Sequence, residues 1–127
     1  VSNTDDSAET YFALAVIERA RARDEAIGVL QNVVDSSDVG DNEKISAVDS
    51  LSEIAGNIEA EANIETWLKA KGFDDCLAVI DGKSARIIIG TDDSLMANEI
   101  AQITEAVYSC AGILPTDLII TEKKNDK

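Results

Sequence analysis

The sequence predicts an α+β fold in which the elements follow the order α-α-β-β-α-β. Apolar residues recur at helical spacing over residues 7–35 and 42–71, which fill the first half of the chain. Two runs rich in β-branched residues, 75–80 and 84–90, come next, and a third helix and a last strand end the chain. A chain of 127 residues suits a single domain. We therefore expect one domain in which a three-stranded sheet packs on helices.

The first helix is expected over residues 7–35. Asp6 and Glu9 resemble the start of a capping box. The expected inward stripe comprises Ala13, Ile17, Ala20, Ile27, Leu30 and Val34. A helix of this length extends about 43 Å, more than a small domain needs, so its N-terminal half is expected to project. That half is either a solvated helix held by charge pairs such as Arg21 with Glu25, or a docking helix or stalk from an upstream anchor.

The second helix is expected over residues 42–71, after a loop of turn-forming residues at 36–41. Lys71 and Gly72 end it, because a cation suits the last turn and a glycine accepts the left-handed conformation that follows. The expected buried stripe comprises Ile45, Val48, Leu51, Ile54, Ala55, Ile58, Ala62, Ile64 and Leu68. Two helices joined by a short loop form an antiparallel pair.

The segment Asp81-Gly82-Lys83-Ser84 resembles the end of a nucleotide-binding P-loop but is better explained as a hairpin. A P-loop needs an earlier glycine where this chain has Leu77, and it needs a helix after the serine. Residues 85–89 are instead rich in β-branched side chains, which favour a strand. Asp81-Gly82 is expected to form the tight turn, because both residues tolerate the positive φ that it requires.

A third helix is expected over residues 94–111, with Thr91-Asp92-Asp93 as its N-terminal cap and Gly112 at its end. Its expected inward residues are Leu95, Ile100, Ile103 and Val107. Residues 117–121 are expected to form the last strand. The chain from Glu122 onward is expected to be a frayed polar tail.

The predicted sheet carries apolar residues on both faces. Cys76, Ala78, Ile80, Ile87 and Ile89 share one face, whereas Leu77, Val79 and Ile88 share the other. A sheet covered by helices on one side normally shows polar residues on the other, and here Arg86 is the exception in an apolar face. Either the long first helix wraps behind the sheet, or another subunit covers that face.

Composition argues against several classes of function. The formal net charge of −14 disfavours binding to nucleic acid or to anionic membranes through this domain. The chain has no histidine, no glycine-rich phosphate loop and no metal-ligand cluster, so we assign no catalytic, cofactor-binding or metal-binding residue and expect no cofactor. Cys76 and Cys110 are interpreted as buried apolar residues and not as a disulfide, because a strand start and a helix end lie at opposite ends of such a sheet.

Three segments of the sequence resemble the stage III sporulation protein AH family. They are Tyr11-Phe12, the R-x-x-x-R-D-E-A stretch at 19–26 and the E-x-x-I-E-x-x-L-x-x-K-G stretch at 61–72. The apolar hairpin, the third helix and the last strand continue the match over nearly the whole chain. None of these motifs is catalytic, and their order and spacing together carry the resemblance.

The resemblance implies a ring-building motif, α-β-β-α-β, similar to that of flagellar and type III secretion basal-body rings, with an extra helix in front. The single domain would then comprise an extended N-terminal helix (1–40), a ring-building-motif core (41–122) and a polar tail (123–127). Family members carry an N-terminal transmembrane helix in the mother-cell membrane. Residues 1–127 contain neither a signal peptide nor an apolar run of about 18 residues, so this anchor is expected upstream of Val1.

The resemblance also implies a place and a partner. The soluble domain of family members lies between the mother-cell and forespore membranes, binds stage II sporulation protein Q of the forespore, and forms a channel-like ring with it. We therefore predict a non-enzymatic sporulation protein that binds a Q-type partner and its own copies. The alternatives are a generic protein-interaction module and a KH-like nucleic-acid-binding module, which would need a G-x-x-G loop and a basic groove. An enzyme with paired carboxylates would need an aromatic-lined cleft, which this aromatic-poor chain could hardly build.

Surface apolarity suggests where such an interface lies. The candidate residues are Leu77, Val79, Arg86, Ile88 and Ile119 on the outer sheet face, and Arg19 and Arg23 on the first helix. Ring formation needs two different patches that meet. With a charge of −14 per subunit, neighbouring copies repel each other, so the isolated domain is expected to be a monomer that assembles when tethering or a partner raises its effective concentration.

Overall fold

The computed structural model describes residues 8–124, and its elements follow the predicted order. They are α1 (Ala8–Asp35), α2 (Asp41–Ala70), β1 (Cys76–Asp81), β2 (Ser84–Thr91), α3 (Ala97–Ala111), a 3-10 turn η1 (Pro115–Asp117) and β3 (Leu118–Lys124). The predicted α+β class and the order α-α-β-β-α-β are confirmed. Asp6, predicted to cap the first helix, lies outside the described residues.

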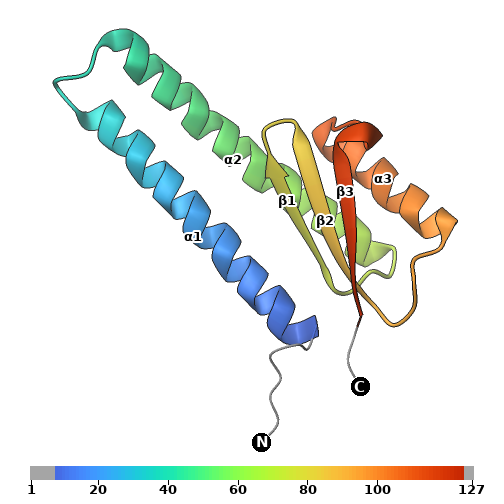
Figure 1. The fold of residues 1–127 in the computed structure, drawn as a ribbon. Helices are drawn as coiled ribbons and strands as arrows, with labels where there is room; N and C mark the ends of the chain where they lie inside the picture. Colours follow the sequence, from blue (N-terminus) through green and yellow to red (C-terminus); the bar gives the residue numbers. More distant parts are fainter. Residues whose placement is uncertain (1–7, 125–127) are drawn as a thin grey trace, which may run out of the picture.

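β2 is the centre of a three-stranded sheet with the order β1-β2-β3. β1 pairs with β2 antiparallel through a tight hairpin. β3 pairs with β2 in parallel, because α3 carries the chain back to the end at which β2 begins. β1 and β3 are therefore the two edges of the sheet (Figure 1).

The hairpin turns one residue later than predicted. Asp81 pairs with Ser84, so the two-residue loop is Gly82-Lys83 and not Asp81-Gly82. Gly82 has a φ of +62°, and no other residue type within residues 8–124 has a positive φ. Asp81 remains in the strand because the one positive φ of this turn falls on the glycine, which adopts it without a steric penalty.

The core lies between the sheet and helices α2 and α3, which pass behind the three strands in Figure 1. The sheet face predicted to carry Cys76, Ala78 and Ile80 faces this core, as expected. The largest fully buried side chains are Ile64, Leu68, Ile87, Ile89, Ile103 and Val107. Each such side chain contributes about 1.5–3 kcal/mol relative to an exposed one, so this aliphatic cluster is the main source of stability.

The N-terminal half of α1 lies against the sheet, so the expectation that it projects is wrong. Tyr11 and Arg19 line a groove together with Leu77 and Ile88 of the outer sheet face. The ring centroid of Tyr11 lies 5.2 Å from Nζ of Lys123 on β3. Leu77 and Ile88 are only 2% and 3% exposed, which confirms the alternative in which the first helix wraps behind the sheet.

The part of the molecule that projects is the hairpin formed by the C-terminal half of α1 and the first half of α2 (Figure 1). The predicted antiparallel pair is present. The buried faces of the two helices differ from the predicted apolar stripes. Eight residues of those stripes are exposed: Ala13, Ile17, Ala20, Ile45, Val48, Ala55, Ile58 and Ala62. The reason is that the inward faces also carry charged residues, Arg19 and Arg23 on α1 and Glu61 on α2, which a search for apolar spacing passes over.

The last helix and strand also differ from prediction at their ends. α3 begins at Ala97 and not at residue 94; Thr91 is the last residue of β2, and Asp92-Asp93 form a bend after it. The first turn of α3 is held by Glu99, whose carboxylate accepts the N–H of Met96 at 2.8 Å. β3 continues to Lys124, so residues 122–124 belong to the strand and not to a tail. The remaining tail residues, 125–127, lie outside the described residues.

Two predictions about this region are refined. Gly112 ends α3, as expected, and adopts the left-handed conformation with a φ of +70°. Ile100, predicted to face inward, is 41% exposed. Among residues 8–124, no helix combines the length and the apolar character that a membrane crossing requires.

Candidate interaction surface

β1 is an edge strand, and side chains of α1 and α2 cover its free edge. In an antiparallel pair, alternate residues turn their N–H and C=O groups toward the partner strand, and the residues between them turn these groups away. On β1 the groups that receive side chains are those of Ala78 and Ile80. An uncovered row of such groups is a template for pairing with another chain.

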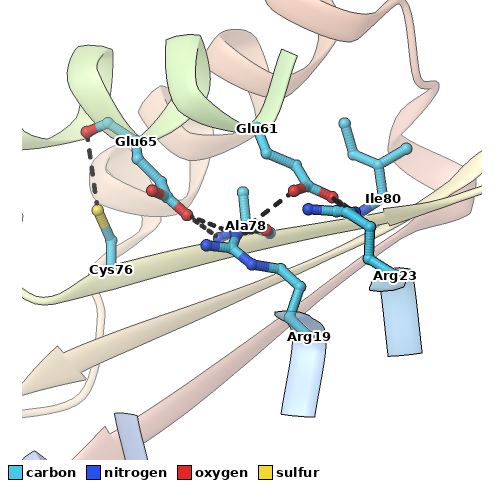
Figure 2. Close-up of polar contacts among 7 residues, drawn as sticks. All are labelled: Arg19, Arg23, Glu61, Glu65, Cys76, Ala78 and Ile80. Atoms are coloured by element: carbon cyan, nitrogen blue, oxygen red, sulfur yellow. Dashed lines mark hydrogen bonds and ion pairs between the residues drawn. The ribbon is translucent and has the colours of Figure 1, made fainter. Parts of the chain in front are cut away.

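Three side chains supply the hydrogen bonds that a further strand would supply (Figure 2). Oε2 of Glu65 accepts the N–H of Ala78 at 2.9 Å, and Nη1 of Arg19 donates to the C=O of Ala78 at 2.6 Å. Oε2 of Glu61 accepts the N–H of Ile80 at 2.8 Å. The free edge of β1 is thus occupied at both residues by the protein's own helices.

The same side chains form ion pairs with one another. Nη1 of Arg19 lies 3.0 Å from Oε2 of Glu65 and 3.4 Å from Oε1 of Glu61, and Nη2 of Arg23 lies 2.8 Å from Oε2 of Glu61. The Glu61 side chain is only 3% exposed, so its charge must be compensated inside the protein. Two guanidinium groups and one backbone N–H compensate it. We call Arg19, Arg23, Glu61 and Glu65 the edge-capping network.

The spacing of the network matches the spacing of the strand. Arg19 and Arg23 are four residues apart, as are Glu61 and Glu65, which corresponds to about 6 Å along a helix. Residues on one edge of a strand are two apart, which corresponds to about 6.6 Å. Both helix pairs can therefore follow the same strand edge in register. The two glutamates had no predicted role, and this repeated four-residue spacing was the signal that could have found them.

The residues predicted as an interface do not form one free surface. Leu77 and Ile88 are buried beneath α1. Arg19 and Arg23 belong to the edge-capping network. These four residues therefore stabilise the fold and do not form a free surface. Val79 is half-buried beside α1. Arg86 is exposed, and Ile119 is 61% exposed. These two are paired in register on β2 and β3, away from α2 and α3.

The opposite edge of the sheet, formed by β3, has a different character. Within residues 8–124, β2 is the one strand that pairs with β3. A polar contact beside this strand joins the carboxylate of Glu122 to the N–H of Leu95 at 3.3 Å. That contact involves the Glu122 side chain and leaves the outer backbone groups of β3 without a neighbouring strand. We call this row of groups the open edge.

Comparison with known proteins gives the family. A model described as SpoIIIAH-like protein matches residues 1–120. The chain belongs to the SpoIIIAH-like family. A chain in the solved "Structure of the SpoIIQ-SpoIIIAH pore forming complex" has the same fold, with a TM-score of 0.81 and 22% sequence identity over 91% of this chain and 98% of that chain. No curated protein sequence matches significantly.

In this SpoIIIAH-like chain, the segments that carried the resemblance also build the edge-capping network. The stretch at 19–26 contributes the two arginines, and the stretch at 61–72 contributes the two glutamates. Two arginines of the first motif and two glutamates of the second therefore have a structural explanation, namely that they fix α1 and α2 to β1.

The cysteines of this SpoIIIAH-like chain have environments that suppress their reactivity. Burial, with the charge of Glu65 as the next contribution, raises the pKa of the Cys76 thiol from 9.0 to about 11. Burial also raises the pKa of Cys110. Both thiols are free; Cys76 is buried, as predicted, and Cys110 is half-buried. Within residues 8–124, no cluster of three or more histidine, cysteine, aspartate or glutamate residues is placed to hold a metal ion.

Proposed function

We propose that this chain is a non-enzymatic assembly module of endospore formation that binds a SpoIIQ-type protein. The observation that carries the proposal is the match of the SpoIIIAH-like family model to residues 1–120. The similarity of the fold to a chain of a SpoIIQ-SpoIIIAH complex supports it. The charges of the edge-capping network hold helices on a strand, which is a structural role and supports the non-enzymatic part of the proposal.

The proposed site of action is the space between the mother-cell and forespore membranes. In this proposal a transmembrane segment upstream of Val1 anchors the chain in the mother-cell membrane, and the partner reaches it from the forespore. The two proteins together form a channel-like ring or a bridge between the cells. The net charge of −14 disfavours binding of this domain itself to nucleic acid or to anionic lipid.

Self-association in this proposal depends on tethering. Two copies cannot extend one sheet head to tail, because the free edge of β1 is already occupied by the edge-capping network. Strong like charge on each copy opposes association further. The isolated chain is therefore expected to sediment as a monomer at about 100 µM, and a stable ring of this chain alone would contradict this part of the proposal.

The experiment that tests the proposed function is a titration of this chain against the extracellular domain of the SpoIIQ-type protein from the same genome. Sedimentation velocity should show a defined complex with a Kd in the micromolar range or tighter, as expected for a specific interface of standard size. Absence of a complex at about 100 µM of both proteins would remove the partner from the proposal and leave the family and fold unchanged.

A further inference from the structure

We infer that the open edge of β3 is a strand-pairing site, at which an extended acidic segment of the SpoIIQ-type partner joins the sheet as a fourth strand. This inference rests on the proposed function and names the surface through which the chain binds its partner. Strand addition draws its affinity from backbone hydrogen bonds and its specificity from alternate side chains. Both features can be assessed from the two edges of this sheet.

The two edges of the sheet differ in what covers them. On β1, side chains of α1 and α2 occupy outward groups at Ala78 and Ile80. On β3, residues 118–124 offer seven strand positions and no second strand lies beside them within the described residues. A strand of this length extends about 23 Å, enough to pair with a typical strand of five or six residues. The sheet can therefore be extended at β3 and not at β1.

Exposed apolar side chains lie next to the open edge. Ile119 is 61% exposed on the outer face of β3, and Leu114, just before η1, is 52% exposed. By contrast, Leu118 and Ile120 point to the other face and pack against the core. A partner strand beside β3 would cover Ile119, which gives apolar burial in addition to backbone pairing.

The local charge near the open edge differs in sign from the charge of the whole chain. Although the chain carries a net charge of −14, two cations lie on the outer face at or next to β3: Arg86, and Lys123, whose ammonium group lies over the ring of Tyr11. Lys124 points to the opposite face. Arg86 is paired in register with Ile119, and Lys123 lies two strand positions beyond Thr121 on the same face. A partner strand that alternates apolar and acidic residues complements this row.

The same charges argue against a second copy of this chain as the occupant. On the outer face β3 presents Ile119, Thr121 and Lys123 and no carboxylate, because Glu122 points to the opposite face. An antiparallel β3–β3 pair would therefore leave Arg86 without an acidic neighbour and would bring two chains of charge −14 together. A different polypeptide, acidic along one face of an extended segment, fits better.

Amide hydrogen exchange of the isotope-labelled chain, measured with and without the extracellular domain of the SpoIIQ-type protein, tests the inference. In the complex, every second amide between residues 119 and 123 should exchange at least about tenfold more slowly, because only alternate N–H groups point to the open edge. The exchange rates of the Ala78 and Ile80 amides should be unchanged.

A complex that leaves the exchange rates of the β3 amides unchanged overturns the inference while the proposed function stands. Absence of any complex overturns both, and β3 protection that grows with the concentration of this chain alone shows self-pairing and overturns it as well.

Side-chain variants provide a second readout. Ile119→Asp places a charge where the partner strand should lie and should weaken binding at least about tenfold. Val29→Asp is the matched control, because Val29 is 63% exposed on the projecting part of α1, and it should change the Kd less than about twofold. Arg86→Glu should weaken binding and make the Kd less dependent on salt concentration. Arg21→Glu, on the exposed side of α1, should change neither. Equal effects of the open-edge and α1 variants would overturn the inference.

Discussion

The carboxylate of Glu61 accepts the backbone N–H of Ile80 at 2.8 Å, so a helix side chain stands where a neighbouring strand would otherwise pair. The same oxygen receives Arg23 at 2.8 Å. One buried acid thereby joins α1, α2 and β1, and its protection of the strand edge depends on the charges around it. The predictions below follow from this arrangement and from the burial of the residues near it.

Glu61→Ala should lower the free energy of unfolding by about 3–5 kcal/mol, because it leaves two half-buried arginines short of a partner and the Ile80 N–H without an acceptor. Glu61→Gln should cost less, since its amide oxygen can still accept from Ile80. Chemical denaturation monitored by circular dichroism measures both. Glu59→Ala, on the exposed side of the same helix, is the control and should change stability by less than about 0.5 kcal/mol. A Glu61→Ala loss as small as the control would show that the network contributes little.

Arg19→Met should loosen the N-terminal half of α1 from β1. It removes the donor to the C=O of Ala78 and the ion pair to Glu65, which should cost about 2 kcal/mol. Amide exchange at Ala78 should become faster as the edge opens more often. Arg21→Met, on the exposed side of the same helix, should change neither quantity. If both variants behave alike, α1 is held by apolar packing and not by the network.

Leu77→Asp and Ile88→Asp should prevent stable folding, because each places a charge at a position that is 2% or 3% exposed beneath α1. Ile119→Asp should fold with a melting temperature within a few degrees of the parent, because that side chain is largely in water. Thermal melts of the three variants separate these outcomes. A cooperative, parent-like melt of Leu77→Asp would mean that α1 leaves the sheet easily in solution.

Cys76 should resist alkylation by iodoacetamide at pH 8 in the folded chain, because its thiol is buried and has a pKa of about 11. Cys110 is less buried and should react first, although its pKa is also raised. Mass spectrometry after digestion distinguishes the two sites. Rapid modification of Cys76 without denaturant would contradict the buried environment.

The same thiol gives the stability a pH dependence. The folded-state pKa of Cys76 lies above its ordinary value of 9.0, so between pH 9 and 11 the unfolded chain releases a proton that the folded chain retains. Stability is unaffected by this group below pH 9 and falls by about 2 kcal/mol as the pH rises toward 11. The difference between the parent and Cys76→Ala in urea denaturation across this range isolates the effect, and parallel curves would contradict it.

Much of the fold could be predicted from the sequence, because helical and alternating patterns and glycine positions are local signals. The order of elements and the left-handed glycine after the second helix, Gly72, are examples. The Gly82 turn shifted by one residue, since strand pairing and not the Asp-Gly pair set the register. The inward faces of the long helices were misassigned for a different reason. Their buried positions carry Arg19, Arg23 and Glu61, and no local pattern shows that these charges neutralise one another across the fold.

The candidate surface shows the same limit. The apolar residues on the outer sheet face suggested an interface with another protein. Leu77 and Ile88 are instead buried beneath α1 of the same chain. Which apolar residues of a strand are covered by another part of the same chain depends on the tertiary structure, and local sequence patterns do not show it. Arg86 is exposed at the side of the groove beneath α1, and Ile119 lies outside that groove and is also exposed.

The contact between the Tyr11 ring and Lys123, with 5.2 Å between ring centroid and Nζ, brings the beginning of α1 beside the end of β3. The described chain therefore enters and leaves the fold at one pole, while the loop between α1 and α2 lies at the other (Figure 1). A circularly permuted protein, opened within residues 36–40 and joined by a short flexible linker between the old ends, should keep the same sheet and the same helix positions. It would also free the tip of the helical hairpin for attachment to a surface, with β3 at the far end.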